Sequence, residues 1–210
     1  MIFKRIKGKG ILAKLLEQCI RILLIKECKK IRNIKIDIIS SSTQIIKGEI
    51  QEINIIAEDI NYKSLLFDQF ELKANYLKID FKIVTKELYF RNDPIIKFKI
   101  SLSQNSLKKV LLSNEWNYIA NIISKEILSQ DKLNNIKINN GRLFINSIDE
   151  NNTINEVEQI EIKADKGKIY IKNRAYNKTL KVPIEEKIYI ENVNIENDLI
   201  SIFGKSSISI

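Results

Sequence analysis

Apolar residues fall at every second position over most of the chain after Asn33, and this spacing constrains the fold more than any other feature. The first alternating segments cover residues 34–38, 53–57, 70–74, 77–83 and 96–102. Successive side chains of a strand point to opposite faces, so segments of this kind bury one face and expose the other. The pattern therefore predicts long antiparallel strands that share one apolar face.

Three short signals divide these segments. Lys47-Gly48 and Asp93-Pro94 are typical of turns. The alternation changes parity near Asn75-Tyr76, which predicts a bulge or bend within this part of the sheet.

Residues 11–31 instead carry apolar side chains at the spacing of a helix. The apolar arc is wider than a surface helix needs, so we expect a curved sheet, a partner or lipid to cover much of its circumference. Cys19 and Cys28 would lie about 180° apart around this helix and cannot form a disulfide with each other.

The alternation is lost again after residue 102, which predicts a second helical region. Ser103 is a favourable N-cap for a short helix through Leu111, and Ser113 or Asn114 would cap a second helix through Ile127.

Strands return after this region. Asn140-Gly141 is the strongest hairpin signal in the chain, and Asp165-Lys166-Gly167 predicts a further turn. The predicted strands cover residues 136–138, 143–145, 160–164, 169–171, 180–190, 193–195, 200–202 and 208–210. We therefore expect an α+β protein in which a long curved antiparallel sheet packs around an N-terminal helix, with a second helical segment mid-chain.

The length of 210 residues is enough for one domain with a substantial core. We expect a basic N-terminal arm over residues 1–10 and a single α+β domain over residues 11–210. Residues 31–36 and 133–138 are similar in sequence, so two helix-and-meander halves are an alternative organisation. The two halves would cover residues 11–102 and 103–210.

The net charge of +9 belongs to the N-terminal sixth of the chain. Residues 1–35 contain eleven basic side chains and two acids, Glu17 and Glu27, whereas the rest of the chain contains 24 of each sign. This asymmetry favours contact with a polyanion, either an anionic membrane surface or a nucleic acid. A solvated helix face in a lysine-rich chain is the alternative.

The chain has no His and two Cys, which removes most catalytic and metal-binding arrangements. Nucleophile–base pairs that depend on His are impossible, and two Cys alone do not make a zinc site. The acidic pairs Glu58-Asp59, Asp149-Glu150 and Glu185-Glu186 are interpreted as solvated charges. We therefore expect no enzymatic activity, no metal and no cofactor.

No segment has the length of a membrane-spanning helix, because the longest apolar run covers residues 22–25. The N-terminus lacks an uninterrupted apolar region and a small-residue cleavage site, so no signal peptide is expected. Together with the unpaired Cys residues, these features predict a cytoplasmic protein, peripheral to a membrane if it binds one.

Two sets of residues are candidates for binding. A strand face of Ile, Leu and Phe offers no polar groups, as an acyl chain requires, although a closed core has the same composition. The candidate groove residues are Ile53, Ile55, Phe70, Leu72, Phe81, Phe98 and Ile100. The candidate membrane or headgroup-binding residues are Lys4, Arg5, Lys7, Lys9 and Lys14.

Nucleic-acid binding would need basic residues interleaved with aromatic residues. Tyr170, Arg174, Tyr176 and Tyr189 are the best cluster of this kind, but this half of the chain has no net positive charge. Nucleic acid is therefore not the expected partner.

A further pattern covers residues 44–112. It consists of Gly48, Ile50, Ile53, Ile55, Ala57 and Tyr62, strands around Phe70-Leu72 and up to Phe81, and the helix opening Ser103-Gln104-Asn105-Ser106-Leu107. In these residues and in its order of elements the chain resembles the LmeA-like phospholipid-binding family, long catalogued as a domain of unknown function and common in cyanobacteria and actinobacteria. It departs from the family at Lys63-Ser64, where members often have Gly, and at Gln51, near which members have Pro.

The resemblance implies a non-enzymatic domain that binds phospholipid, with a curved antiparallel sheet around a long helix, similar to tubular lipid-binding modules. It carries over no catalytic residues. Two alternatives stay open from the sequence. One is a protein–protein interaction module that uses the N-terminal helix as an interface, and the other is RNA binding through the basic arm.

Changing Lys4, Arg5, Lys7 and Lys9 to Gln is expected to abolish binding to anionic liposomes. Each cation near an anionic bilayer contributes about 1 kcal/mol, and added salt screens this contribution. The Tm should stay nearly unchanged because these residues precede the predicted helix. Cosedimentation at low salt measures the binding.

Two outcomes would contradict this prediction: undiminished binding by the variant, or equal binding of the wild type to neutral and anionic vesicles. A wild-type preference for RNA over anionic vesicles of matched charge would favour the RNA alternative.

Overall fold

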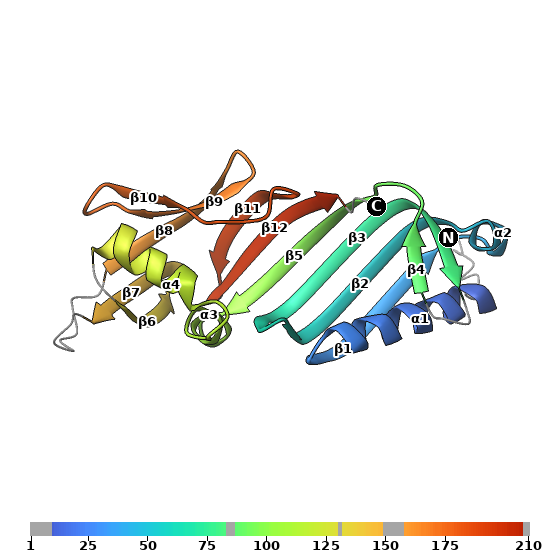
Figure 1. Ribbon diagram of the computed structural model, residues 1–210, viewed down its shortest axis with the longest axis horizontal. Coiled ribbons are helices and arrows are strands. Elements are labelled where there is room, and N and C mark those ends of the chain that lie inside the picture. The colour runs from blue at the N-terminus through green and yellow to red at the C-terminus, as the bar shows by residue number, and fades with distance from the viewer. Residues whose placement is uncertain (1–9, 83–86, 130–131, 149–157, 208–210) are drawn as a thin grey trace, which may run out of the picture.

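The computed structural model describes residues 10–82, 87–129, 132–148 and 158–207. Figure 1 shows an elongated α+β protein in which a long helix lies along one end of a large sheet, while a smaller sheet and further helices lie at the other end. The predicted fold class is confirmed, with an N-terminal helix, a long antiparallel sheet and a helical segment mid-chain.

The larger sheet has seven strands in the order β1-β2-β3-β5-β12-β11, with β4 paired to β3. All of these pairs are antiparallel. The strands are β1 (Lys30–Ile39), β2 (Glu49–Tyr62), β3 (Leu65–Lys82), β4 (Glu87–Phe90), β5 (Ile95–Ser103), β11 (Ile188–Glu196) and β12 (Leu199–Ser207). The last two strands of the chain therefore complete the sheet that the first strands begin.

The smaller sheet has five strands in the order β10-β9-β8-β7-β6. They are β6 (Lys132–Asn139), β7 (Arg142–Ile148), β8 (Glu158–Asp165), β9 (Lys168–Asn173) and β10 (Lys178–Lys181). The helices are α1 (Ile11–Glu27), α2 (Ser42–Ile46), α3 (Gln104–Leu111) and α4 (Asn117–Ile123), which continues into the π-helix η1 (Ser124–Leu128).

α1 ends four residues earlier than the sequence predicted. The N–H of Cys28 donates to the Leu24 carbonyl at 3.1 Å, and the N–H of Lys29 then donates to the Asn61 carbonyl at 2.9 Å. From this point the backbone pairs with β2, so the residues around Ile31 belong to β1. The prediction was wrong over residues 28–31 because pairing with a distant strand replaced the helical hydrogen bonds.

The single strand predicted over residues 180–190 is also wrong. β10 ends at Lys181 and β11 begins at Ile188, and the two strands belong to different sheets. Pro183 lies in the connection between them, where its missing N–H removes a donor that a ladder would need. The strand predicted over residues 208–210 lies outside the described residues.

The two predicted helix caps have different outcomes. Ser103 caps α3 as expected, because its hydroxyl accepts a hydrogen bond from the N–H of Ser106 at 3.3 Å. Ser113 or Asn114 as the cap of the next helix is wrong. The Ser113 hydroxyl accepts from the N–H of Trp116 at 3.3 Å, but this bond closes a turn, and α4 begins only after Trp116.

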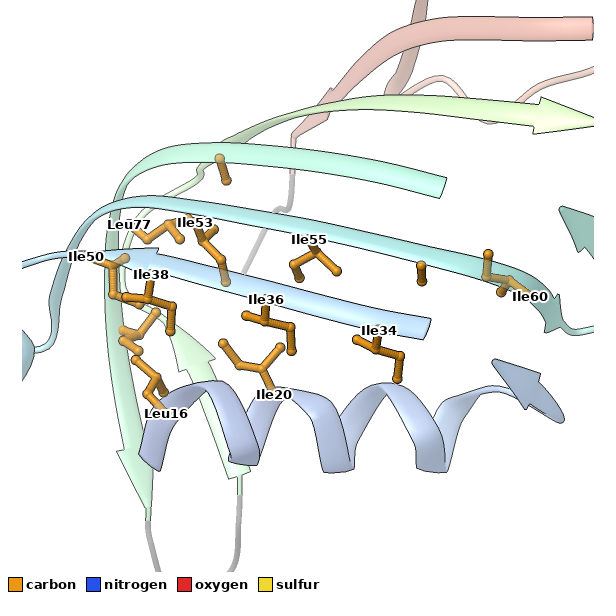
Figure 2. Close-up of a cluster of buried hydrophobic side chains, with 13 residues drawn as sticks. Leu16, Ile20, Ile34, Ile36, Ile38, Ile50, Ile53, Ile55, Ile60 and Leu77 are labelled. Atoms are coloured by element: carbon orange, nitrogen blue, oxygen red, sulfur yellow. The ribbon is translucent and has the colours of Figure 1, made fainter. Parts of the chain in front are cut away.

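The predicted irregularity at Asn75-Tyr76 is a bend. Tyr76 has a φ of 54°, in the left-handed region. The register between β2 and β3 nevertheless continues without a shift, since Glu52 pairs with Asn75 and Ile50 with Leu77. The parity of the buried residues therefore changes at the same place in both strands, from Ile53 to Ile50 and from Ala74 to Leu77, while all four stay in one core. β3 turns there beside the N-terminal half of α1 (Figure 2).

The predicted hairpin turns are confirmed. Asn140 and Gly141 have φ angles of 50° and 70°, and Lys166 and Gly167 have φ angles of 47° and 79°. Two successive positive φ angles are the requirement of the two-residue turn that matches the twist of antiparallel strands.

The first hydrophobic core lies between α1 and the N-terminal part of the larger sheet. Figure 2 shows Leu16 and Ile20 pointing from α1 toward Ile36 and Ile38 of β1, with Ile53 of β2 beyond them. Burying aliphatic side chains of this size stabilises the fold by about 1.5–3 kcal/mol each. The buried members are Leu16, Ile20, Ile34, Ile36, Ile38, Ile50, Ile53, Ile55, Ala57, Ile60, Ala74, Leu77 and Ile79.

The second hydrophobic core lies between the smaller sheet, α4 and η1, and it includes Ile200 of β12. The two sheets are joined at Gly167 and Ile190, where the Ile190 N–H donates to the Gly167 carbonyl at 3.0 Å. The boundary between the two predicted halves falls where β5 gives way to α3, yet β11 and β12 belong to the sheet of the first half. Division of the chain into one domain or two halves stays a prediction.

The larger sheet has one apolar face and one charged face. Directly paired residues form a row across six strands of the apolar face: Ile36, Ile55, Leu72, Phe98, Gly204 and Ile190. The opposite face carries cross-strand ion pairs, namely Glu52–Lys73 at 2.8 Å, Glu71–Lys99 at 3.0 Å and Glu191–Lys205 at 3.4 Å. The alternation in the sequence predicted this one-sided sheet.

We expect Gly204→Ala to destabilise the protein by about 1–3 kcal/mol, the usual range for overpacking. A Cβ at this position would lie 2.6 Å from Cζ of Phe98 and 2.8 Å from the Tyr189 carbonyl oxygen. Urea denaturation measures the free energy of unfolding. Ser207→Ala, at an exposed position of the same strand, is the control and should change it by less than ~0.5 kcal/mol. Equal stability of the two variants would contradict the prediction.

Candidate functional site

The apolar face of the larger sheet is covered at both ends and less completely in the middle. α1 packs over the β1 and β2 end, and the second core covers the end near Ile200. Between them five apolar side chains of β3 and β5 are only half-buried. We call this set the central strip, and its members are Phe70, Leu72, Ile96, Phe98 and Ile100.

The members of the central strip face the same side of the sheet because they are direct cross-strand partners. Phe70 pairs with Ile100 and Leu72 with Phe98, while Ile96 pairs with the buried Ala74. Side chains at such positions have their Cβ atoms about 4.5–5.5 Å apart, so the strip forms one continuous apolar surface.

A cavity of about 260 Å³ lies beside the central strip, between α1 and the sheet. Of the described residues that line it, all except Glu27 are apolar. They are Ile20, Leu23, Leu24 and Glu27 of α1, Ile50, Ile53 and Ile55 of β2, Leu72, Ala74, Leu77 and Ile79 of β3, Phe90 of β4 and Ile96 of β5. Leu72 and Ile96 belong both to this cavity and to the central strip, so the two features are continuous.

The chemistry of this site favours hydrocarbon. Each methylene group transferred from water to an apolar environment contributes about 0.8 kcal/mol. Pockets for small molecules usually have volumes of ~300–1,000 Å³ and contain a few polar groups that fix the orientation of the ligand. This cavity is smaller than that range and nearly free of polar groups, so it suits one end of an elongated apolar chain that continues along the central strip.

The structure brings most of the predicted groove residues together. Ile53 and Ile55 line the cavity, Leu72 joins the cavity to the central strip, and Phe70, Phe98 and Ile100 lie in the strip. The seventh, Phe81, lies in β3 beyond the bend, and its side chain is outside the described part of the structure.

Sequence reasoning missed the other walls of the cavity. Ala74 and Ile96 followed the alternating pattern but were not selected, and their pairing across β3 and β5 was the missing information. Leu23, Leu24 and Phe90 come from α1 and β4, and the sequence gives no sign that these elements border the same space.

The predicted headgroup-binding residues are mostly outside the described part of the chain. Lys4, Arg5, Lys7 and Lys9 precede it, whereas Lys14 is exposed on α1. Further along, Arg32 and Lys30 form ion pairs with Asp59, so part of the N-terminal positive charge is neutralised at the start of β1.

A wide depression of about 740 Å³, lined by both polar and apolar residues, lies on the smaller sheet. Arg174 and Tyr176 line it, but Tyr170 and Tyr189 do not, so it does not assemble the cluster considered for nucleic acid. The Arg174 guanidinium donates to the Glu161 carboxylate at 2.8 Å, which leaves this cation paired.

The resolved pKa shifts belong to ordinary structural contacts. Hydrogen bonds from Lys73, Ser64 and Arg174 lower the pKa values of Glu52, Glu115 and Glu161, respectively. Burial, with a smaller effect of Glu27, raises the pKa of the Cys28 thiol. These carboxylates favour their charged form and the thiol its neutral form, so these groups are not tuned for proton transfer or nucleophilic attack near neutral pH.

The described residues form neither a cluster of metal ligands nor a membrane-spanning helix. No three His, Cys, Asp or Glu side chains among them lie close enough together to hold a metal ion. None of the described helices combines the length and the apolar character needed to cross a membrane.

Comparison of the chain with protein-family models, curated proteins and solved structures finds no match. Membership of the LmeA-like family therefore stays a prediction that rests on the sequence pattern.

Ile55→Ala is expected to cost less stability than Ile38→Ala. Both side chains are buried in the first core, but only Ile55 borders the cavity, so it loses fewer packing contacts. A fully packed site loses about 2–5 kcal/mol on this change, and we expect Ile38→Ala to fall in that range and Ile55→Ala below it. Urea denaturation of the two variants measures the difference, and a larger loss for Ile55→Ala would show that the site is plain core.

Proposed function

We propose that this protein is a non-enzymatic phospholipid-binding protein that associates with anionic membrane surfaces. An acyl chain enters the cavity beside α1 and continues along the central strip, and the basic N-terminal residues contact anionic headgroups. Lipid is the partner, and the protein needs no metal or cofactor for this role.

The observation that carries the proposal is the continuity of the cavity with a half-exposed apolar strip. A closed core would bury Phe70, Phe98 and Ile100, as it buries Ile55 and Ile79. Contiguous exposed apolar surface is uncommon in folded monomers and marks binding sites. An acyl chain on the strip would remove this surface from water and leave no polar group of the ligand without a partner.

The charge distribution supports the same partner. Eleven of the 35 basic residues lie in the first 35 positions, with only two acids. Each cation near an anionic bilayer contributes about 1 kcal/mol, and an apolar anchor combined with basic residues gives firmer attachment than either feature alone.

The direct test is extraction of lipid from the purified protein, followed by mass spectrometry. Co-purification of phospholipid at close to one molecule per chain is the expected result. A lipid-free protein that forms a stable oligomer would instead favour the protein–protein interaction module.

Ala74→Leu should weaken uptake of a fluorescent fatty acid by about tenfold, equivalent to ~1.4 kcal/mol. Ala74 lines the cavity, so the larger side chain occupies space that the ligand needs. Lys97→Leu is the matched control because it introduces the same side chain outside the cavity. Lys97 follows Ile96 in β5, so it lies exposed on the opposite, charged face of the sheet. Titration with the probe measures both variants, and Tm values confirm that they are folded. Equal uptake by Ala74→Leu and Lys97→Leu would count against the cavity.

A further inference from the structure

α1 carries two apolar stripes on opposite sides, of which the sheet covers one. The inner stripe is Ala13, Leu16 and Ile20, which are 3–9% exposed. The outer stripe is Ile11, Leu15, Ile22 and Ile25, with exposures of 85%, 45%, 43% and 53%. The wide apolar arc seen in the sequence therefore has a second side that the described structure leaves in solvent.

The outer residues form a line along the helix. Their spacing of four, seven and three residues keeps them on one face, with the polar Gln18 filling the gap. Beside the outer stripe, Ile46 of α2 is 76% exposed and lines a depression together with Leu15. The ion pair Asp80–Arg91 lines the same depression. Isolated exposed aliphatic residues are normal on a protein surface, whereas a contiguous apolar patch marks an interaction site.

The charged side chains of α1 that lie beside the outer stripe have one sign. Lys14, Arg21 and Lys26 flank it. The two acids of α1 lie on other sides of the helix: the Glu17 carboxylate accepts a hydrogen bond from the N–H of Ile38 at 3.2 Å, and Glu27 borders the cavity. An apolar stripe bordered by cations is the arrangement of a helix that lies in the interface of an anionic membrane.

We infer that the outer stripe of α1 is the membrane-docking face of this protein, inserted at the headgroup–acyl boundary of an anionic bilayer with its flanking cations at the phosphates. The inference rests on the proposed function and adds the orientation of the protein on the membrane. The inner side of the same helix forms a wall of the cavity, so docking holds the cavity about one helix diameter, ~10 Å, from the lipid.

Charge complementarity favours a membrane over a second copy of the chain. Two copies that paired along the outer stripe would bring Lys14, Arg21 and Lys26 of each chain to the same interface, and like charges that flank a helix pair oppose association. An anionic surface neutralises all three. The two acids of α1 are both directed elsewhere and cannot compensate the cations in a homodimer.

The first test compares two triple variants by cosedimentation with vesicles of equal parts phosphatidylcholine and phosphatidylglycerol. Leu15→Gln/Ile22→Gln/Ile25→Gln replaces three of the four outer-stripe residues without changing charge. Ile56→Gln/Ile95→Gln/Leu112→Gln is the matched control, because these aliphatic residues are similarly exposed, at 38%, 59% and 43%, but lie away from α1. We expect at least a tenfold loss of vesicle binding in the first variant and none in the control.

A second measurement does not depend on the triple variant folding. An environment-sensitive fluorophore is attached at Ile22→Cys in a Cys19→Ser/Cys28→Ser background, and at Ile56→Cys in the same background as control. The same anionic vesicles should shift the emission of the Ile22 label to the blue and leave the Ile56 label unchanged. An unchanged Ile22 label on vesicle-bound protein would overturn the inference.

The remaining outcomes separate the inference from the proposed function. Undiminished vesicle binding by the outer-stripe variant, or a wild-type dimer in light scattering that the variant converts to a monomer, overturns the docking face. Uptake of a fatty-acid probe in solution, without vesicles, tests the cavity alone. Normal uptake by the outer-stripe variant together with lost vesicle binding supports the inference, whereas no uptake by the wild type refutes the proposed acyl site.

Discussion

The pairing of β5 with β12 is the interaction on which the rest of the structure depends. Ser103 pairs with Leu199 and Ile95 with Ser207, so the ladder joins segments that are about 100 residues apart. It places β12 between β5 and the edge strand β11, where one end of β12 completes the apolar face and the other supplies Ile200 to the second core. Without this ladder the part of the sheet made by β1, β2, β3 and β5 would end at an open edge. The second core would also lose the wall that contains Ile200. Long-range pairing of this kind is slow to form, because the loop-closure entropy must be overcome before the contacts stabilise it.

The half-exposed central strip is a geometric result of this architecture. Two covering units pack on the same apolar face: α1, which is joined directly to β1, and the helices and smaller sheet that precede β11 and β12. Each unit lies over the strands nearest to it in the sequence. The middle strands, β3 and β5, are contacted by α3, yet Phe70, Leu72, Ile96, Phe98 and Ile100 stay half-buried. The opposite face is satisfied by cross-strand ion pairs such as Glu71–Lys99 and needs no cover.

Local sequence signals predicted the elements of this fold well, because their physical causes are local. The alternation of apolar residues predicted the strands. Turn residues such as Asn140-Gly141, which adopt positive φ angles, predicted the hairpins, and Ser103 predicted the start of α3. The errors occurred where a distant partner decided the outcome. After Cys28 the backbone pairs with β2 instead of continuing the helix. The strands on either side of Pro183 belong to two different sheets. The candidate site shows the same division. Most groove residues were identified from the alternation within their own strands, whereas Leu23 of α1 and Phe90 of β4 became their neighbours only through tertiary packing.

The hydrogen bond from the Ile38 N–H to the Glu17 carboxylate has a consequence for solubility. β1 is an edge strand, and an unpaired row of backbone donors on such a strand is a template for addition of another chain. The Glu17 carboxylate accepts a hydrogen bond from one of these donors. α1 also lies along the same strand, where it sterically obstructs the approach of a strand from another chain. The helix thus protects the edge of the sheet from aggregation through strand pairing. A chain that lacked α1 would expose both the aliphatic row of β1 and its hydrogen-bonding edge, which are the two ingredients of intermolecular strand pairing.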